Sequence, residues 1–385
     1  MIDAKRIQSL PQIPSPVLTA YLSTSPGSPC NQGRSTGYVI YLKSRAKVLA
    51  QRLSQAERKS FEKQVKRVEN HLRNRRPGAR GLVIFAGDGA WEEFHLQVEV
   101  EDELHWGRPS LTQLLWLLDE HQACGVAHVD RKGVRLLRLW LGEMEEVEHE
   151  KFQVDTTAWR RKDAPKPAGR PARAGAPARG ALRDAFERRV EVQYARLYRE
   201  TAQRIEQWAQ GEKFAAVFVA GPISVAEPLW KELSGAFRSQ SGLIRCDLAR
   251  FTTAALQQQI APQIENWKRQ REKALVEEVL AMARTDGGGA AAGIDNTLDA
   301  LQRGRARELV VVRGLGGKLR LCASCGWASR SADANCPACG AARDVAPLRA
   351  VLPELARRWS VPVEVVAGEA AQILREAGGL AARFR

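Results

Sequence analysis

No stretch of this chain approaches the roughly 20 consecutive apolar residues that a membrane-spanning helix requires. The N-terminal residues Met1–Arg6 carry charge where a signal peptide needs an apolar segment. Both absences disfavour a membrane or secreted protein. We therefore expect a protein of the reducing cytoplasm with no membrane partner.

Histidine is scarce, and its positions suggest no site. The six histidines do not follow the spacing of metal ligands, and no Ser/His/Asp arrangement can be assigned from the sequence. Only seven cysteines are present, and Cys30, Cys124 and Cys246 stand alone, as free thiols would. The sequence thus offers no candidate for a histidine-based metal centre or a catalytic triad.

The remaining four cysteines form a C-x2-C-x10-C-x2-C array: Cys322, Cys325, Cys336 and Cys339. A two-residue gap lets each pair place both thiolates on one side of a tight turn, and Gly326 and Gly340 suit that turn because glycine accepts positive φ. The array predicts a zinc ribbon over residues 320–342 that holds a structural Zn²⁺ ion, since four sulfur ligands leave no vacant position. Two redox-active cysteine pairs are the alternative, but they would require a thioredoxin-like βαβ context.

The formal net charge of +15 and the pI near 9.8 indicate a polyanionic partner. Nucleic acid is the leading candidate. The alternative is a composition rich in Arg, Ala and Gly that reflects a GC-rich genome, in which case the charge carries no function.

The order of apolar segments predicts an α/β fold with three α/β domains: residues 1–121, 122–285 and 286–385. Buried strands are expected at Gly81–Gly87, Phe94–Val100, Cys124–Val129, Val134–Leu141, Phe214–Pro222, Glu308–Arg313 and Val363–Val366. Helices are expected at Tyr38–Arg75, Ala226–Phe237, Ala254–Ala283, Ile294–Gly304 and Val345–Trp359. The zinc ribbon interrupts the third domain.

Residues 159–180 break this pattern, because they are rich in Ala, Pro, Gly and Arg and have almost no large apolar residue. We expect a mobile basic loop that binds RNA phosphates. Its proposed contact residues are Arg160, Arg161, Lys162, Arg170, Arg173 and Arg179.

The C-terminal third carries a recognisable series of segments. A helix that ends at Ala300–Arg305 leads into the strand Glu308–Val312, a Cys-x-x-Cys insert follows, and the chain closes on Ala377–Arg385. This ending resembles the "Gly-Gly-Ile-Gly-Ala, Leu-Arg-Tyr" ending of archaeal and eukaryotic class 1 peptide chain release factors, whose third domain has a similar order of elements.

Two other regions extend this resemblance. The helix Glu200–Gln210 before Val217–Pro222 is similar to the middle domain of release factors and of their relative Pelota, so the likeness covers roughly residues 122–385. The strand Val17–Leu22 and the helix start Tyr38–Lys43 resemble the N-terminal domain of bacterial proteins related to these factors.

The resemblance implies a three-domain protein that enters the ribosomal A site, where the middle domain presents a Gly-Gly-Gln loop for peptide release. This sequence contains no Gly-Gly-Gln, and Arg179-Gly180-Ala181 occupies the corresponding place when counted back from Phe186. It also lacks Asn-Ile-Lys-Ser, the codon-reading motif of the family. Neither canonical peptide release nor stop-codon decoding is therefore expected.

We predict a monomeric, ribosome-associated translation factor that acts in ribosome rescue or quality control without hydrolysing peptidyl-tRNA. Its partners would be the ribosome, ribosomal RNA or tRNA, and, as the family implies, a translational GTPase. One alternative is a peptidyl-tRNA hydrolase with a rearranged loop around Gly180, because backbone groups alone can position water. The other is a protein–protein adaptor with no role on the ribosome.

Overall fold

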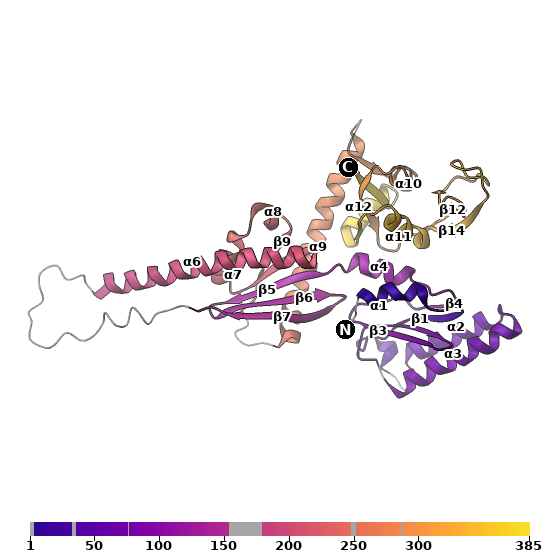
Figure 1. The fold of residues 1–385 in the computed structure, drawn as a ribbon, viewed down its shortest axis with the longest axis horizontal. Coiled ribbons are helices and arrows are strands. Elements are labelled where there is room, and N and C mark those ends of the chain that lie inside the picture. Colours follow the sequence, from indigo (N-terminus) through magenta and orange to yellow (C-terminus); the bar gives the residue numbers. More distant parts are fainter. Residues whose placement is uncertain (1–3, 33–35, 76, 154–178, 248–251, 286–287) are drawn as a thin grey trace, which may run out of the picture. The chain divides into compact units, whose positions relative to one another are not determined.

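The computed structural model describes residues 4–32, 36–75, 77–153, 179–247, 252–285 and 288–385. The chain forms two compact units (Figure 1). The first holds Met1–His121, Leu141–Glu143 and Arg269–Arg385, and the second holds Gln122–Trp140 and Met144–Lys268. None of the described helices is both long and apolar enough to cross a membrane.

The N-terminal part of the first unit is built on an antiparallel sheet with the strand order β3-β2-β1-β4. The strands are β1 (Val17–Ser23), β2 (Gly81–Gly87), β3 (Ala90–Leu96) and β4 (Glu103–Gly107). Leu18, Ala20 and Leu22 alternate toward one face and pack beneath the two helices that cover it, α2 (Gly37–Ala50) and α3 (Gln55–Asn74). The short helices are α1 (Ala4–Ser9), η1 (Leu10–Gln12) and η2 (Pro29–Asn31).

Two expectations for this part were wrong. The helix expected at Tyr38–Arg75 is two helices, because Ser54 starts a new one: its hydroxyl accepts from the amide of Glu57, whose carboxylate accepts from the amide of Ser54. The strand expected at Phe94–Val100 is β3, which lies earlier in the sequence because it forms a hairpin with β2.

The second unit contains a five-stranded sheet with the order β7-β6-β5-β8-β9. Its strands are β5 (Cys124–Asp130), β6 (Gly133–Trp140), β7 (Glu143–Lys151), β8 (Ala216–Gly221) and β9 (Ser241–Arg245), with β5, β8 and β9 parallel. Helices α6 (Arg179–Glu212), α7 (Ile223–Glu232) and α8 (Gly235–Arg238) lie on one face. Leu256, Ile260 and Ile264 of α9 (Thr253–Arg284) cover the other.

Glycine is required where β8 meets β5. A Cβ atom on Gly221 would lie 2.1 Å from the carbonyl oxygen of Val129, so no side chain fits there. The sequence run Val217–Pro222 thus combines a buried strand with the close approach that ends it.

The C-terminal part of the first unit contains a sheet with the order β10-β16-β11-β15. The strands are β10 (Ala290–Ala292), β11 (Ala306–Val312), β15 (Val363–Val366) and β16 (Leu380–Phe384), and only β11 and β15 run parallel. Helices α10 (Ile294–Gln302) and α11 (Leu348–Arg358) pack on one face, whereas α12 (Gly368–Glu376) and the C-terminal half of α9 pack on the other.

A three-stranded sheet, β13-β12-β14, is inserted between β11 and α11. Its strands are β12 (Lys318–Cys322), β13 (Ala328–Ser329) and β14 (Arg343–Pro347). The helix expected from Val345 starts only at Leu348, because Val345 and Pro347 pair with β12. The α/β class and the inserted four-cysteine ribbon are confirmed, whereas the three predicted domain boundaries stay predictions.

Candidate metal centre and basic surfaces

The fold brings the four cysteines of the array together at one end of the ribbon. Their sulfur atoms all lie within 4.8 Å of one another. The Sγ atoms of Cys322 and Cys339 are 3.5 Å apart, as are those of Cys325 and Cys336. Four converging sulfurs are a donor set that can hold a metal ion.

Both cysteine pairs sit on the same tight turn. The amide of Gly326 donates to the carbonyl oxygen of Cys322 at 2.9 Å, and the amide of Gly340 donates to that of Cys336 at 2.8 Å. The two glycines have φ of 74° and 75°, a conformation that glycine adopts at no steric cost. The positions of these glycines in the sequence therefore follow from the turns.

Backbone amides favour the thiolate at Cys322 and Cys336, whereas at Cys325 the amide of Trp327 is outweighed by burial and the neighbouring cysteine sulfurs, which raise the pKa of that thiol to about 12. The amide of Cys325, helped by that of Ser324, lowers the pKa of the Cys322 thiol to about 6, since hydrogen bonds to sulfur favour the thiolate. Burial opposes ionisation of Cys336, but the amides of Ala338 and Cys339 outweigh it, so the pKa of that thiol is lowered as well. Deprotonated sulfur is the form that binds a metal.

Three contacts attach the ribbon to the helices of its own domain. The buried amide of Gln302 on α10 pairs with the backbone of Ala328, donating to its carbonyl oxygen (2.8 Å) and accepting from its N–H (2.6 Å). Arg358 on α11 donates to the carbonyl oxygen of Cys325 at 3.0 Å. Arg330 forms an ion pair of 2.7 Å with Asp295. Two of these contacts reach the first cysteine turn, at Cys325, and the strand after it, at Ala328. Hydrogen bonds therefore connect the four-cysteine cluster directly to α10 and α11.

The predicted RNA-binding residues fall mostly outside the described residues. Arg160, Arg161, Lys162, Arg170 and Arg173 all lie in the segment 154–178. Arg179 is the first residue of α6, so the structure assembles no site from this set.

Helix α6 extends past the end of its sheet (Figure 1). Tyr198 and Ile205 of α6 are buried against the sheet, whereas Arg188 and Arg189 are exposed and Val192 is 70% exposed. Gly180 is the second residue of this helix, which gives it helical backbone and not the open turn of a catalytic loop.

A second basic surface, not anticipated from the sequence, covers the N-terminal sheet. Residues 37–75 contain eleven lysines and arginines but only three acidic residues. Glu57 is held in the helix cap, Glu62 pairs with Arg58 at 2.8 Å, and Glu69 contacts Lys43 and Arg73. The exposed cations with no ion pair within the described ranges are Arg45, Lys47, Arg52, Lys59, Lys66, Arg67 and Arg75. We call this surface, formed by α2 and α3, the helical basic layer.

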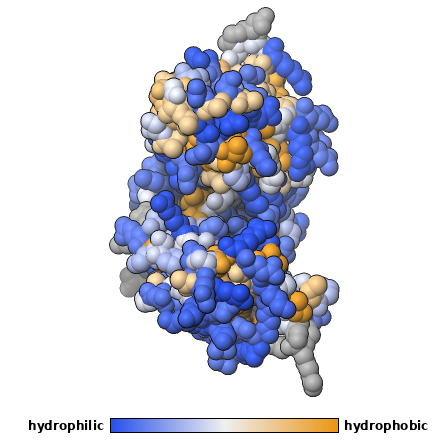
Figure 2. Space-filling model, turned by 90° about the vertical axis from the view of Figure 1, so that its right-hand side faces the viewer, coloured by the Kyte–Doolittle hydropathy of each residue, from blue (hydrophilic) through white to orange (hydrophobic). Residues whose placement is uncertain are grey.

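Lysine content could have revealed this layer. Five of the 15 lysines of the chain lie between residues 37 and 75, although arginine is far commoner elsewhere. A GC-rich genome enriches arginine and not lysine, so composition alone does not account for this concentration. One face of the molecule is drawn in Figure 2, where hydrophilic residues dominate and hydrophobic ones are interspersed.

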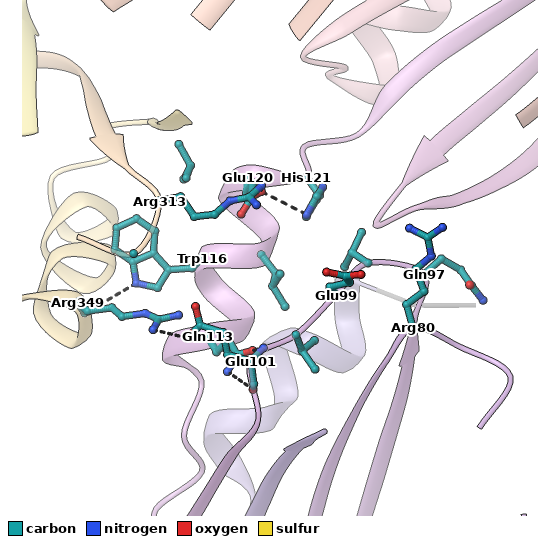
Figure 3. A pocket seen from close by; sticks show the side chains of 15 residues that line it. Arg80, Gln97, Glu99, Glu101, Gln113, Trp116, Glu120, His121, Arg313 and Arg349 are labelled. Atoms are coloured by element: carbon teal, nitrogen blue, oxygen red, sulfur yellow. Dashed lines mark hydrogen bonds and ion pairs between the residues drawn. The ribbon is translucent and has the colours of Figure 1, made fainter. Parts of the chain in front are cut away.

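A polar pocket of about 380 Å³ lies within the first unit, lined by α4 (Thr112–Glu120), the connection before β4 and the loop after β11 (Figure 3). Arg349 reaches Glu101 at 2.7 Å, and Arg313 pairs with Glu120. Since basic and acidic side chains face each other across it, the pocket favours neither an anion nor a cation. It forms a seam of ion pairs between the two parts of this unit.

Asp119 adds to this seam a carboxyl whose charge depends on pH. Burial raises the pKa of its carboxyl to about 6, even though Arg357 lies 3.3 Å away and favours the charged form. The seam therefore contains a carboxyl that titrates within the pH range of ordinary measurements.

Residues 109–242 match a protein family described as "Bacterial archaeo-eukaryotic release factor family 10". This segment runs from the loop before α4 to β9. Over this segment the chain is release factor-like, as its sequence motifs predicted, although the sequence contains no Gly-Gly-Gln. The match supports a role in translation.

Solved structures of release factors and of Pelota-type proteins align with this chain at low identity. An archaeal translation termination factor, aRF1, is 16% identical over 99% of this chain and 96% of its own, with a TM-score of 0.24. A model of ribosome-bound archaeal Pelota and ABCE1 is 13% identical over 99% and 93%, with a TM-score of 0.42. Dom34 of S. cerevisiae, described as interacting with Hbs1, is 9% identical over 79% and 80%, with a TM-score of 0.41. No curated protein matches this chain.

Proposed function

We propose that this protein is a ribosome-associated translation factor that acts in ribosome rescue or quality control by binding the A site, without hydrolysing peptidyl-tRNA. The observation that carries this proposal is the release factor family match across α4, β5, β8 and the intervening α6. The C-terminal motifs of the sequence add support, because they lie outside the matched segment and point to the same family.

The charge distribution supports RNA as the partner. The helical basic layer offers Lys47, Lys59 and Lys66 as exposed cations, and an excess of one charge on a surface attracts a polyanion. Each phosphate contact releases condensed counterions, so binding through such a layer weakens steeply with salt. The proposed loop contacts from Arg160 to Arg179 would add to the same effect.

Two features support the absence of hydrolysis. The sequence contains no Gly-Gly-Gln, and Gly180, the residue nearest to its expected place, lies in the first turn of α6. Helical backbone at Gly180 differs from the open course that two successive glycines allow in the Gly-Gly-Gln loop. The protein would then occupy the A site and recruit other factors.

For the ribbon we propose a structural zinc ion bound by Cys322, Cys325, Cys336 and Cys339. Four thiolates satisfy the tetrahedral preference of Zn²⁺ and leave no position for water, so the ion would stabilise the fold and take no part in chemistry. Zinc is favoured over other divalent metals because thiolates select soft or borderline ions.

Sedimentation through sucrose gradients tests the ribosome proposal. We expect the full-length protein to migrate with ribosomes or the large subunit at low salt and to be released at high salt. The triple variant Lys47→Gln, Lys59→Gln and Lys66→Gln removes three charges from the helical basic layer, and a variant lacking residues 159–180 removes the loop. For the triple variant, the slope of log binding constant against log salt should fall by roughly 2 to 3.

The matched control removes the same charge from elsewhere, by Lys132→Gln, Lys231→Gln and Lys318→Gln, and should bind much as the wild type does. Migration of the wild type only at the top of the gradient at every salt concentration would refute the proposal and favour the adaptor. A single-turnover assay with peptidyl-tRNA in ribosome complexes tests the second part. Release that depends on the protein and is abolished by Gly180→Val would instead establish the hydrolase alternative.

A further inference from the structure

A buried arginine is paired across the ribbon sheet with Cys322, and no carboxylate among the described residues forms an ion pair with it. Arg343, the first residue of β14, is only 4% exposed, and in the ribbon sheet it is directly opposite Cys322. Arginine is rarely buried to this extent unless an anion accompanies it. The small ribbon therefore contains a charge that needs an explanation.

The hydrogen bonds of Arg343 all go to neutral acceptors. Its Nη1 donates to the hydroxyl of Ser329 at 2.7 Å, its Nη2 donates to the carbonyl oxygen of Ser331 at 3.3 Å, and its Nε donates to that of Asp333 at 3.1 Å. Nη2 also donates to the carbonyl oxygen of Asp333. The donors are thus satisfied, but among the described residues no carboxylate forms an ion pair with this guanidinium.

These bonds hold the segment that joins the two cysteine turns. Ser329, Ser331 and Asp333 lie between Cys325 and Cys336, so Arg343 fixes the path along which the second turn returns to face the first. The rigid, planar fork of guanidinium suits this task, because several acceptors are engaged at fixed angles.

A metal ion bound by the four cysteines would supply the negative charge that the buried guanidinium of Arg343 lacks. Four thiolates around a divalent ion carry a net charge of −2, and a partly buried centre of that charge is stabilised by a nearby cation. We propose that Arg343 is a positioning residue of the zinc site, whose guanidinium both orders residues 329–333 and serves as counter-ion to the tetrathiolate. This inference rests on the proposed zinc site and assigns the residue that governs how firmly the ion is retained.

Three substitutions in the full-length protein separate charge from hydrogen bonding. Arg343→Lys keeps the charge but loses the fork, Arg343→Gln keeps some hydrogen bonds but loses the charge, and Arg343→Met loses both. Arg330→Gln is the matched control, because Arg330 belongs to the same ribbon but is exposed and paired with Asp295. The readout is the rate of zinc release to a chromogenic chelator.

We expect Arg343→Gln and Arg343→Met to release zinc about 10- to 100-fold faster than the wild type, the range found when a group outside the ligand set is removed. Arg343→Lys should recover most of the retention, and Arg330→Gln should behave as the wild type does. With Co²⁺ in place of zinc, the sulfur-to-metal absorption band should shift in Arg343→Gln and stay near the wild-type position in Arg343→Lys.

Three results would overturn the inference. Zinc release from a folded Arg343→Gln variant at the wild-type rate means that the charge has no effect on the metal. Equally faster zinc release from the Lys and Gln variants means that Arg343 acts only through its hydrogen bonds and not through its charge. If Arg343→Gln does not fold, the Lys variant decides, and fast release from it contradicts the counter-ion role. A wild-type protein that holds no zinc by mass spectrometry is a different outcome, since it refutes the zinc site itself.

Discussion

Trp116 should be the residue on which the first unit depends most strongly for its integrity. It belongs to α4, which follows the N-terminal sheet, yet the residue is only 8% exposed and belongs to the core cluster of the C-terminal sheet, which also contains Leu309, Val351 and Val363. Its indole N–H donates to the carbonyl oxygen of Arg349 at 2.8 Å. One side chain thus joins two parts that are far apart in the sequence.

The loss of stability expected when Trp116 is replaced can be worked out from this packing. A buried tryptophan replaced by alanine loses its transfer free energy and leaves a cavity, which together cost about 3 to 5 kcal/mol. The lost hydrogen bond accounts for about 1 kcal/mol of this range. Trp116→Phe keeps a ring in the cavity but not the N–H donor, so it should cost about 1 to 2 kcal/mol.

Amide hydrogen exchange measures the loss of stability strand by strand, so strands of the second unit serve as an internal control. Since about 1.4 kcal/mol corresponds to a factor of ten, a loss of about 3 to 5 kcal/mol in Trp116→Ala should accelerate exchange of the most protected amides in β11 and β15 by roughly two to three and a half orders of magnitude. Amides of β8, in the second unit, should be unchanged. Acceleration below tenfold in β11, or an equal acceleration in β8, would show that Trp116 does not link the two parts as described.

Three further predictions concern the metal, the seam and a helix cap. Cys336→Ser should lose the proposed zinc ion and, because binding of a structural metal is coupled to folding, the exchange protection of β12 and β14; metal retained at one ion per chain by mass spectrometry contradicts this. Because the pKa of Asp119 is raised above its unfolded value of about 4 to about 6, its contribution to stability is present below pH 4 and is lost as the pH rises through 6. Asp119→Asn should therefore flatten the urea-unfolding profile across this window by about 1 to 2 kcal/mol, and an unchanged profile speaks against the assignment. Ser54→Ala removes one half of the cap with Glu57 and should destabilise α3 by about 1 kcal/mol in the same assay, with Ser44→Ala as an exposed control that should have little effect.

The features that the sequence predicted correctly are local. The cysteine turns require only a two-residue gap and a glycine, so the four cysteines that the fold brings together could be named before their geometry was known. Buried strands such as β2 and β5 read as continuous apolar runs because both of their faces are covered. The helix α9 could be read from its length and the glycines that follow it.

The features that were missed depend on distant partners or on solvent. Strand β7 is an edge strand rich in glutamate, so it has no apolar alternation that would identify it, and its charge is balanced by Arg135, Arg138 and Arg204 from neighbouring elements. The break between α2 and α3 was in fact readable, since Ser54 and Glu57 have the spacing of a capping box. The docking of Trp116 could not be read from any local pattern, because its partners lie some 200 positions away.

The placement of the ribbon has an evolutionary consequence. The two ends of this insert, between β11 and α11, lie next to each other. Lys318 pairs with Pro347, and the amide of Leu348 donates to the carbonyl oxygen of Gly317 at 3.0 Å. The two ends of the insert are already closed, so replacing it by a short turn adds little loop-closure entropy. We therefore expect that the ribbon can be removed as one piece while the β11–α11–β15 crossover persists. Related chains without the four cysteines should have the same sheet and a direct connection at this point.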